Sequence, residues 1–214
     1  MGDEVSSLLY EKMADGTRAS CIIFSGVSVE SVVESRLLLF FAMTHHFLQI
    51  AYEEFPDLHA LSPAEADLAQ RAQEAQQHAY APYSHFAVGA ALQTETGEIF
   101  TGSNQENVNF KGSCAERVAL DTAASHGFKH GIRTIAIVGN PVGVHGENAA
   151  DHEPISPCGQ CRQDLREVED LGGTELVILL VAPHCVRRFT GMRQLLPFGV
   201  GPQDLGERLL GGKK

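Results

Sequence analysis

The chain has 214 residues, of which 43% are hydrophobic and 20% are charged, values that are ordinary for a folded protein. Its 27 acidic residues outnumber 16 basic ones, giving a formal net charge of −11, and such a surface repels the phosphate backbone of a nucleic acid. Composition therefore disfavours a nucleic-acid polymer as a partner and leaves room for a small, weakly charged ligand such as a nucleoside.

The cysteines do not have the pattern of a disulfide framework, because their number is odd and three of them stand near predicted helix starts. They are Cys21, Cys114, Cys158, Cys161 and Cys185. We expect reduced thiols and a cytoplasmic location. The uncharged stretch at residues 37–52 is shorter than the roughly 20 apolar residues of a spanning helix, and the chain opens with Asp3 and Glu4 rather than a basic leader. No membrane association is expected.

Residues 1–60 are interpreted as an N-terminal extension that contains no ligand-like cluster of side chains. Apolar residues recur at helical spacing from Val29 to Phe55, so one long helix is predicted there. We expect this extension to be mainly helical and to serve packing or contacts between subunits. Residues 61–214 then form the second and larger region.

The second region is predicted to open with a helix that begins at Ser62. Ser62 can cap the helix, Pro63 suits its first turn, and Glu65 completes a capping box. An alanine-rich stretch continues the helix to about His78.

Strands and helices alternate through the rest of the chain. We predict strands at 86–92 and 98–102 joined in a hairpin, a helix at 114–126, a strand at 134–138, a helix at 157–168 and a strand at 175–181. This order predicts an α/β fold, a three-layer α/β/α sandwich around a mixed central sheet whose later strands run parallel.

Cys158 and Cys161 form a C-x-x-C pair at the start of a predicted helix. Two residues three apart lie on the same side of a helix, so both sulfurs can reach one ion, and the positive end of the helix dipole favours thiolates. The motif alone has three interpretations: a metal site, a thioredoxin-like redox pair, or a chance pair of buried thiols.

Cys114 adds a third thiol, at the start of another predicted helix and two residues before Glu116. Three thiol ligands leave the fourth corner of a tetrahedron for water, which is the arrangement of a catalytic rather than a structural zinc site. Glu116 can reach a ligand on such a metal, although a carboxylate in the first turn of a helix can also serve only to complement the helix dipole.

A set of motifs then gives a family resemblance. The motifs are Tyr83–Phe86, Val88–Ala91, Gly102–Asn107, Cys114–Arg117, Ser156–Gln163, Leu195–Pro197 and Gly201–Leu205. In this order they resemble the small, homotetrameric cytidine deaminases with a three-cysteine zinc site. The resemblance covers about residues 62–206 and implies the cytidine deaminase-like fold for the region 61–214.

The resemblance also implies a mechanism. Cys114, Cys158 and Cys161 would hold Zn²⁺, which lowers the pKa of a bound water so that it can attack C4 of cytosine. Glu116 would be the catalytic residue that takes the water's proton, passes it to ring N3 and later protonates the leaving amine. Arg117 resembles the family arginine that hydrogen-bonds the thiolates and offsets their excess negative charge.

The substrate contacts follow from the same resemblance. Asn104 and Glu106 match residues that hydrogen-bond the ribose 3′-hydroxyl, which would select a nucleoside over a free base. Phe86 matches the aromatic residue that packs against the pyrimidine, and Ala115 is expected to contact the substrate too. The implied function is hydrolytic deamination of cytidine and 2′-deoxycytidine in pyrimidine salvage.

Three departures from the family pattern leave alternatives open. The segment between Asn104 and Cys114 is one residue shorter than is usual in the family, and in this it also resembles blasticidin S deaminases. Within that segment, Phe110 stands near the position where the family usually has a tyrosine. Val200 stands where the family often has a phenylalanine that reaches into a neighbouring subunit, and Phe198 can substitute for it.

Two alternative functions remain, one with a different substrate and one without catalytic activity. They are a deaminase of a modified cytosine nucleoside and a catalytically inactive, zinc-stabilised binding protein, while a polynucleotide deaminase conflicts with the net charge of −11. The family implies a homo-oligomer, a tetramer or else a dimer.

Overall fold

The computed structural model describes residues 10–12, 18–20, 45–143 and 153–205. The chain divides into two compact units, Met1–Gln49 and Ile50–Lys214. No helix within the described residues combines the length and the hydropathy needed to cross a bilayer.

In the first unit, two short strands are described. They are β1 (Tyr10–Lys12) and β2 (Arg18–Ser20), which pair antiparallel with Tyr10 opposite Ser20.

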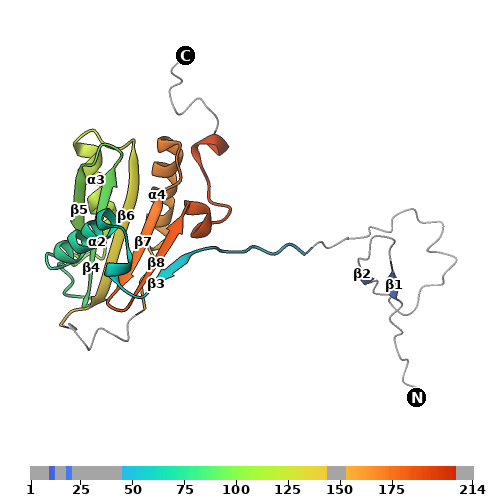
Figure 1. The fold of residues 1–214 in the computed structure, drawn as a ribbon, viewed down its shortest axis with the longest axis horizontal. Helices are drawn as coiled ribbons and strands as arrows, with labels where there is room; N and C mark the ends of the chain where they lie inside the picture. Colours follow the sequence, from blue (N-terminus) through green and yellow to red (C-terminus); the bar gives the residue numbers. More distant parts are fainter. Residues whose placement is uncertain (1–9, 13–17, 21–44, 144–152, 206–214) are drawn as a thin grey trace, which may run out of the picture. The chain divides into compact units, whose positions relative to one another are not determined.

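The second unit is built on a six-stranded sheet with the order β3-β8-β7-β6-β4-β5 (Figure 1). Its strands are β3 (Glu53–Phe55), β4 (Phe86–Thr94), β5 (Ile99–Ser103), β6 (Ile132–Pro141), β7 (Val177–Ala182) and β8 (Cys185–Thr190). Only β6 and β7 pair in parallel; the other neighbours are antiparallel. The mixed sheet of the sequence-based prediction is therefore confirmed.

Helices cover both faces of this sheet. They are α2 (Pro63–Gln76), α3 (Ala115–Ser125) and α4 (Gly159–Gly172), with 3₁₀ turns at η1 (Leu58–Ala60), η3 (Met192–Gln194) and η4 (Pro202–Leu205). Alternation along β6 separates the two sides: Ile135 and Ile137 belong to the core shared with α3 and α4, and Ala136 to the core shared with α2. The three-layer α/β/α sandwich is confirmed.

The capping box predicted at Ser62 is present. The Ser62 hydroxyl accepts a hydrogen bond from the Glu65 amide, and the Glu65 carboxylate accepts one from the Ser62 amide. The predicted hairpin is also present, with Ala91 of β4 opposite Thr101 of β5.

The helix expected from Val29 to Phe55 is wrong where the structure describes it. Residues 45–52 have no regular secondary structure and Glu53–Phe55 form β3, the edge strand beside β8; the earlier part, 29–44, lies outside the described residues. Apolar spacing alone did not distinguish a helix from an extended segment that borders a sheet. The sheet of the second unit therefore begins before residue 61.

Strand β8 was not predicted. Its sequence places two arginines next to each other, and such residues weaken the apolar alternation that marks a strand. Arg187 pairs with Glu54 of β3, while Arg188 pairs with Glu53 of β3 and with Glu65 of α2. The buried Val186 and Phe189 join β8 to the core, and the two arginines between them pair with distant acidic residues.

Two glycines let helices approach the sheet closely from opposite sides. A Cβ atom on Gly89 of β4 would lie 2.1 Å from the carbonyl oxygen of Ala72 in α2. A Cβ atom on Gly102 of β5 would lie 2.5 Å from both the Ala115 carbonyl oxygen and the Ala119 amide nitrogen in α3. Because these neighbours are backbone atoms, the position of α3 depends on a glycine at residue 102.

We expect Gly102→Ala to destabilise the protein by about 1–3 kcal/mol, because the added methyl must push α3 away from β5. In a domain of this size, each kcal/mol lowers Tm by about 2–4 °C, which thermal unfolding followed by circular dichroism would detect. Thr101→Ala, at the exposed neighbouring position of β5, is the matched control. A gain in stability for Gly102→Ala would contradict the close approach of α3.

Candidate metal centre

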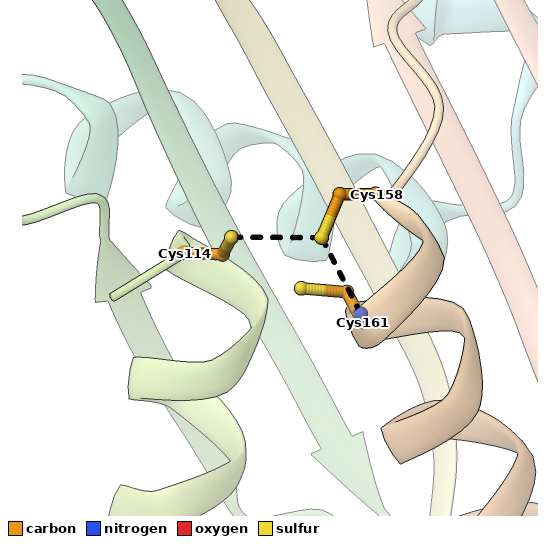
Figure 2. Close-up of side chains that lie close together, drawn as sticks. All are labelled: Cys114, Cys158 and Cys161. Carbon is orange, nitrogen blue, oxygen red and sulfur yellow. Dashed lines mark hydrogen bonds between the residues drawn. The ribbon is translucent and has the colours of Figure 1, made fainter. Parts of the chain in front are cut away.

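Three cysteine sulfurs meet where two helices begin (Figure 2). Cys114 is the N-cap of α3, Cys158 is the N-cap of α4, and Cys161 lies in the first turn of α4. The Sγ atoms of all three lie within 4.8 Å of one another. The structure thus brings together the three ligands that the sequence predicted on separate helices.

The local fold of α4 explains part of this convergence. The Cys158 sulfur accepts a hydrogen bond from the Cys161 amide at 3.5 Å, so the motif caps its own helix. Cys114 makes no side-chain capping bond in α3, and its sulfur lies 3.8 Å from the Cys158 sulfur. Both helices direct their positive dipole ends toward the sulfurs, which favours thiolates.

The spacing of the sulfurs fits a zinc ion. Zn–S bonds of about 2.3 Å in tetrahedral geometry separate two sulfurs by about 3.8 Å. Within the described residues, the group contains no fourth His, Cys, Asp or Glu ligand atom. A three-ligand group of this kind matches a catalytic zinc site better than a closed structural one.

The three thiols do not behave as independent acids. A hydrogen bond with Cys161 is the main cause that lowers the pKa of Cys114 to about 6, against burial and the nearby Glu116 charge, which raise it. The same hydrogen bond, followed by burial, raises the pKa of Cys161 well above its usual range. A divalent cation that replaces the shared proton would stabilise all three sulfurs as thiolates.

Glu116 lies in the first turn of α3 with only 4% of its surface exposed. Burial raises the pKa of its carboxyl group, and hydrogen bonds from its own amide and from Cys161 oppose that shift only in part. A carboxyl whose pKa is moved toward neutrality can both accept and release a proton, so the side chain suits general acid–base chemistry.

A pocket of about 530 Å³ opens beside the sulfurs. Its lining comes from the loops before β4 and α3, from β4, from the first turn of α3, and from the segment before α4. The lining residues are Tyr83, Ser84, Val88, Asn104, Gln105, Glu106, Asn107, Phe110, Gly112, Ser113, Cys114, Ala115, Glu116, Ile155, Ser156 and Cys158. Five residues predicted for catalysis, metal or substrate therefore share one pocket with Cys158: Cys114, Ala115, Glu116, Asn104 and Glu106.

Asn104 and Glu106 are both held by backbone groups of the pocket wall. The Asn104 amide donates to the Phe86 carbonyl at 2.9 Å and accepts from the Val88 amide at 2.8 Å. The Glu106 carboxylate accepts from the amides of Tyr83 and Ser84 at 2.8 and 3.2 Å. Hydrogen bonds from Ser84 and Tyr83 lower the pKa of Glu106, so its side chain is fixed and anionic.

Two predicted site residues lie elsewhere. Phe86 is absent from the pocket lining: a ring carbon of Phe86 and the side chain of Ile155 both approach Gly139 of β6, and Ile155 forms the wall. Arg117 donates to Asp164 of α4 at 2.7 Å rather than to a sulfur. Arg117 nevertheless contributes to lowering the pKa of Cys114, which places its charge close to the cluster.

Sequence reasoning missed the residues that shape the mouth and the apolar wall of the pocket. The rings of Tyr83 and Phe110 lie 5.7 Å apart at an angle of 56°, and both line the pocket. Val88 and Ile155 supply its apolar surface. Val88 belongs to a recognised motif, but only its position on the inner face of β4 indicates a contact with ligand.

Comparisons of the sequence and of the fold with known proteins all indicate the same family. The model of the "Cytidine and deoxycytidylate deaminase zinc-binding region" matches residues 63–173, slightly more than half of the chain. The match includes both helix starts that carry the three cysteines.

Individual relatives agree with the family model. A protein of Dictyostelium discoideum named "Probable cytidine deaminase" is 43% identical over 135 residues, which is 63% of this chain and 82% of that protein. The cytidine deaminase of Sporosarcina psychrophila is 40% identical over 139 residues, 64% of this chain and 92% of that one. A crystal structure of cytidine deaminase from Burkholderia pseudomallei superposes with a TM-score of 0.53 at 38% identity, over 63% of this chain and 97% of that chain.

We expect Cys114→Ser and Cys161→Ser each to weaken zinc binding by more than about tenfold, because each removes a thiolate ligand. Metal analysis of the purified proteins, with competition by a coloured chelator, would measure the change. Cys185→Ser is the matched control because Cys185 lies on β8, outside the cluster. Full zinc content in both cluster variants would contradict the assignment.

Proposed function

The chain belongs to the cytidine and deoxycytidylate deaminase family, and from this premise we propose that it hydrolyses cytidine to uridine, and 2′-deoxycytidine to 2′-deoxyuridine, with release of ammonia. The observation that carries the proposal is the cluster of the Cys114, Cys158 and Cys161 sulfurs beside a pocket that is lined by Cys114, Cys158 and the buried Glu116. The two alternatives, a modified cytosine nucleoside as substrate and an inactive binding protein, are less favoured, because the named relatives are cytidine deaminases.

The three cysteines would hold Zn²⁺, which supplies a water of lowered pKa as the nucleophile. Glu116 would move two protons: its carboxylate would take the first from the attacking water and deliver it to N3 of the pyrimidine. It would then take the second from the new hydroxyl group on C4 and deliver it to the amine, which leaves as ammonia. Burial raises the pKa of Glu116. A carboxyl group with a raised pKa is a better proton acceptor than an ordinary carboxylate and can still donate the proton afterwards, as both proton transfers require.

The charge of the pocket supports a nucleoside rather than a nucleotide or a polymer. Among the residues that the structure describes, those that line the pocket include Glu106 and Glu116 but no lysine or arginine, so a phosphate group would meet negative charge there without a cationic partner. The formal net charge of −11 acts in the same direction at longer range. Cytidine, which is uncharged at neutral pH, fits this environment.

Asn104 and Glu106 are proposed to bind the ribose. Both backbone amides that donate to Glu106 use the oxygen Oε2, and the Ser84 side chain also hydrogen-bonds this carboxylate. Because a carboxylate offers about four acceptor sites, it can still accept from a sugar hydroxyl. Asn104 is held in the same wall with one donor and one acceptor already used, and each of its polar atoms can form a second hydrogen bond. A fixed pair of polar groups at this place would select a nucleoside over free cytosine.

We also propose that residues 61–214, extended at their start by β3, form the catalytic domain, and that copies of the chain associate as a homotetramer or a dimer. Phe110 and Phe198 are 83% and 97% exposed, and both adopt positive φ angles of 57° and 60°. Both rings are therefore available for contact with another copy of the chain. A role in cytoplasmic pyrimidine salvage, with thiols kept reduced, follows from the proposed reaction.

We expect Glu116→Gln to lower kcat for cytidine by at least about 10³-fold, because an amide cannot shuttle the proton, while zinc content stays the same. The formation of uridine, followed by its absorbance change, measures turnover. Glu74→Gln, an exposed position on α2, is the control and keeps wild-type activity. Substantial turnover by Glu116→Gln would contradict the assigned role.

We expect Glu106→Ala to raise KM for cytidine by about 10-fold or more, because it removes a hydrogen bond to a charged group, with zinc content unchanged. Glu106→Gln retains an acceptor for the Tyr83 and Ser84 amides and should fall between wild type and Glu106→Ala. The ribose assignment is wrong if neither substitution changes KM.

A panel of cytidine, 2′-deoxycytidine, free cytosine, cytidine 5′-monophosphate and blasticidin S tests substrate class directly. We expect the two unmodified nucleosides to exceed the others in kcat/KM by at least about 10²-fold, since a buried polar site rejects ligands that leave its groups unpaired. Turnover of blasticidin S above cytidine would support the first alternative. Stoichiometric zinc with no turnover of any substrate would support the second.

A further inference from the structure

One wall of the pocket includes part of a short segment, residues 153–157, that leads directly into Cys158. Ile155 and Ser156 of this segment line the pocket. The segment belongs to neither a helix nor a strand, so no regular ladder of backbone hydrogen bonds fixes it. Its position therefore depends on side chains from other elements.

An arginine holds each end of this segment. At the end nearer Cys158, Arg162 of α4 donates to the Pro157 carbonyl oxygen at 2.9 Å and to the Leu195 carbonyl oxygen at 2.8 Å. At the other end, Nη2 of Arg187 on β8 donates to the Glu153 carboxylate. The wall is thus fixed between α4 and the outer part of the sheet.

Arg187 is itself positioned by residues that precede the family match. Its Nε donates to Glu54 of β3 at 2.9 Å, and Glu54 lies directly opposite Arg187 in the strand register. The guanidinium carbon lies 5.9 Å from the centroid of the Tyr52 ring, and that ring stacks on Phe189 at 5.3 Å. One guanidinium therefore connects β3, β8 and the pocket wall.

We propose that Arg187 is a positioning residue which, together with Glu54 of β3, holds Glu153 and so sets the pocket wall formed by residues 153–157. The N-terminal strand β3 then belongs to the support of the substrate site, although it lies before the region shared with the family model. As a statement about substrate affinity, this inference rests on the proposed function; as a statement about the order of residues 153–157, it does not.

The next residue of β8 provides an internal comparison. Arg187 stands opposite Leu180, which packs with α3 and α4, whereas Arg188 stands opposite Leu179, which packs with α2. Arg188 donates to Glu53 of β3 at 2.6 Å and to Glu65 of α2 at 2.8 Å. Both arginines therefore tie β3 to the sheet, but only Arg187 contacts the pocket wall.

The ion pairs of Arg187 with Glu54 and Glu153 are partly exposed to solvent, and this exposure limits how much they can change substrate affinity. The side chain of Arg187 is 28% exposed, that of Glu54 51% and that of Glu153 75%. Ion pairs at such exposures are weak and are screened by salt. A change of severalfold in substrate affinity is expected, rather than a loss of activity.

The kinetic test compares Arg187→Gln with Arg188→Gln in the full chain. We expect Arg187→Gln to raise KM for cytidine about threefold to fivefold with kcat nearly unchanged, and Arg187→Lys to restore part of the difference. High salt should raise the wild-type KM toward that of Arg187→Gln and leave the variant nearly constant. Arg188→Gln should keep the wild-type KM even if its Tm falls.

A second measurement does not depend on activity. Amide hydrogen exchange in the peptide that spans residues 153–161 should be faster in Arg187→Gln and in Glu54→Gln than in wild type, and unchanged in Arg188→Gln. Equal exchange in all four proteins, or equal acceleration in Arg188→Gln, would overturn the inference. If wild-type protein failed to convert cytidine, the proposed function would fail while the exchange comparison would still decide this inference.

Discussion

The N-termini of helices α3 and α4 lie next to each other, and the three cysteine sulfurs that they carry form the candidate metal site (Figure 2). This placement is costly without a metal, because thiolates repel one another and Cys161 is buried. The helix dipoles and the hydrogen bonds among Cys114, Cys158 and Cys161 reduce that cost only in part. A divalent cation removes it, so metal binding and the packing of the two helices stabilise each other.

Contacts elsewhere in the fold hold the N-termini of α3 and α4 next to each other. Gly102 allows α3 to lie against β5, and the ion pair between Arg117 and Asp164 joins α3 to α4 one turn beyond the cysteines. Glu116 lies in the first turn of α3, where burial raises the pKa of its carboxyl group. The pocket follows from this arrangement: its metal and proton-transfer groups come from rigid helix ends, and its mouth comes from loops.

Much of the site could be predicted from the sequence because its signals are local. The spacing of Cys158 and Cys161, the pair of Cys114 and Glu116, and the capping box at Ser62 each lie within a few residues of chain. The features that could not be predicted depend on distant partners. Strand β3 pairs with β8, where Glu54 lies opposite Arg187, 133 residues further along the chain, and Arg117 pairs with Asp164 on another helix. Apolar spacing near residue 50 predicted a helix because it carries no information about a sheet edge that lies far along the chain.

The most direct measurement of the central claim is X-ray absorption at the zinc edge on the purified, metal-loaded protein. The arrangement of Cys114, Cys158 and Cys161 predicts three sulfur neighbours at about 2.3 Å and one lighter neighbour at about 2.0 Å. Four sulfur neighbours, or a shell completed by protein nitrogen with no place for solvent, would contradict it.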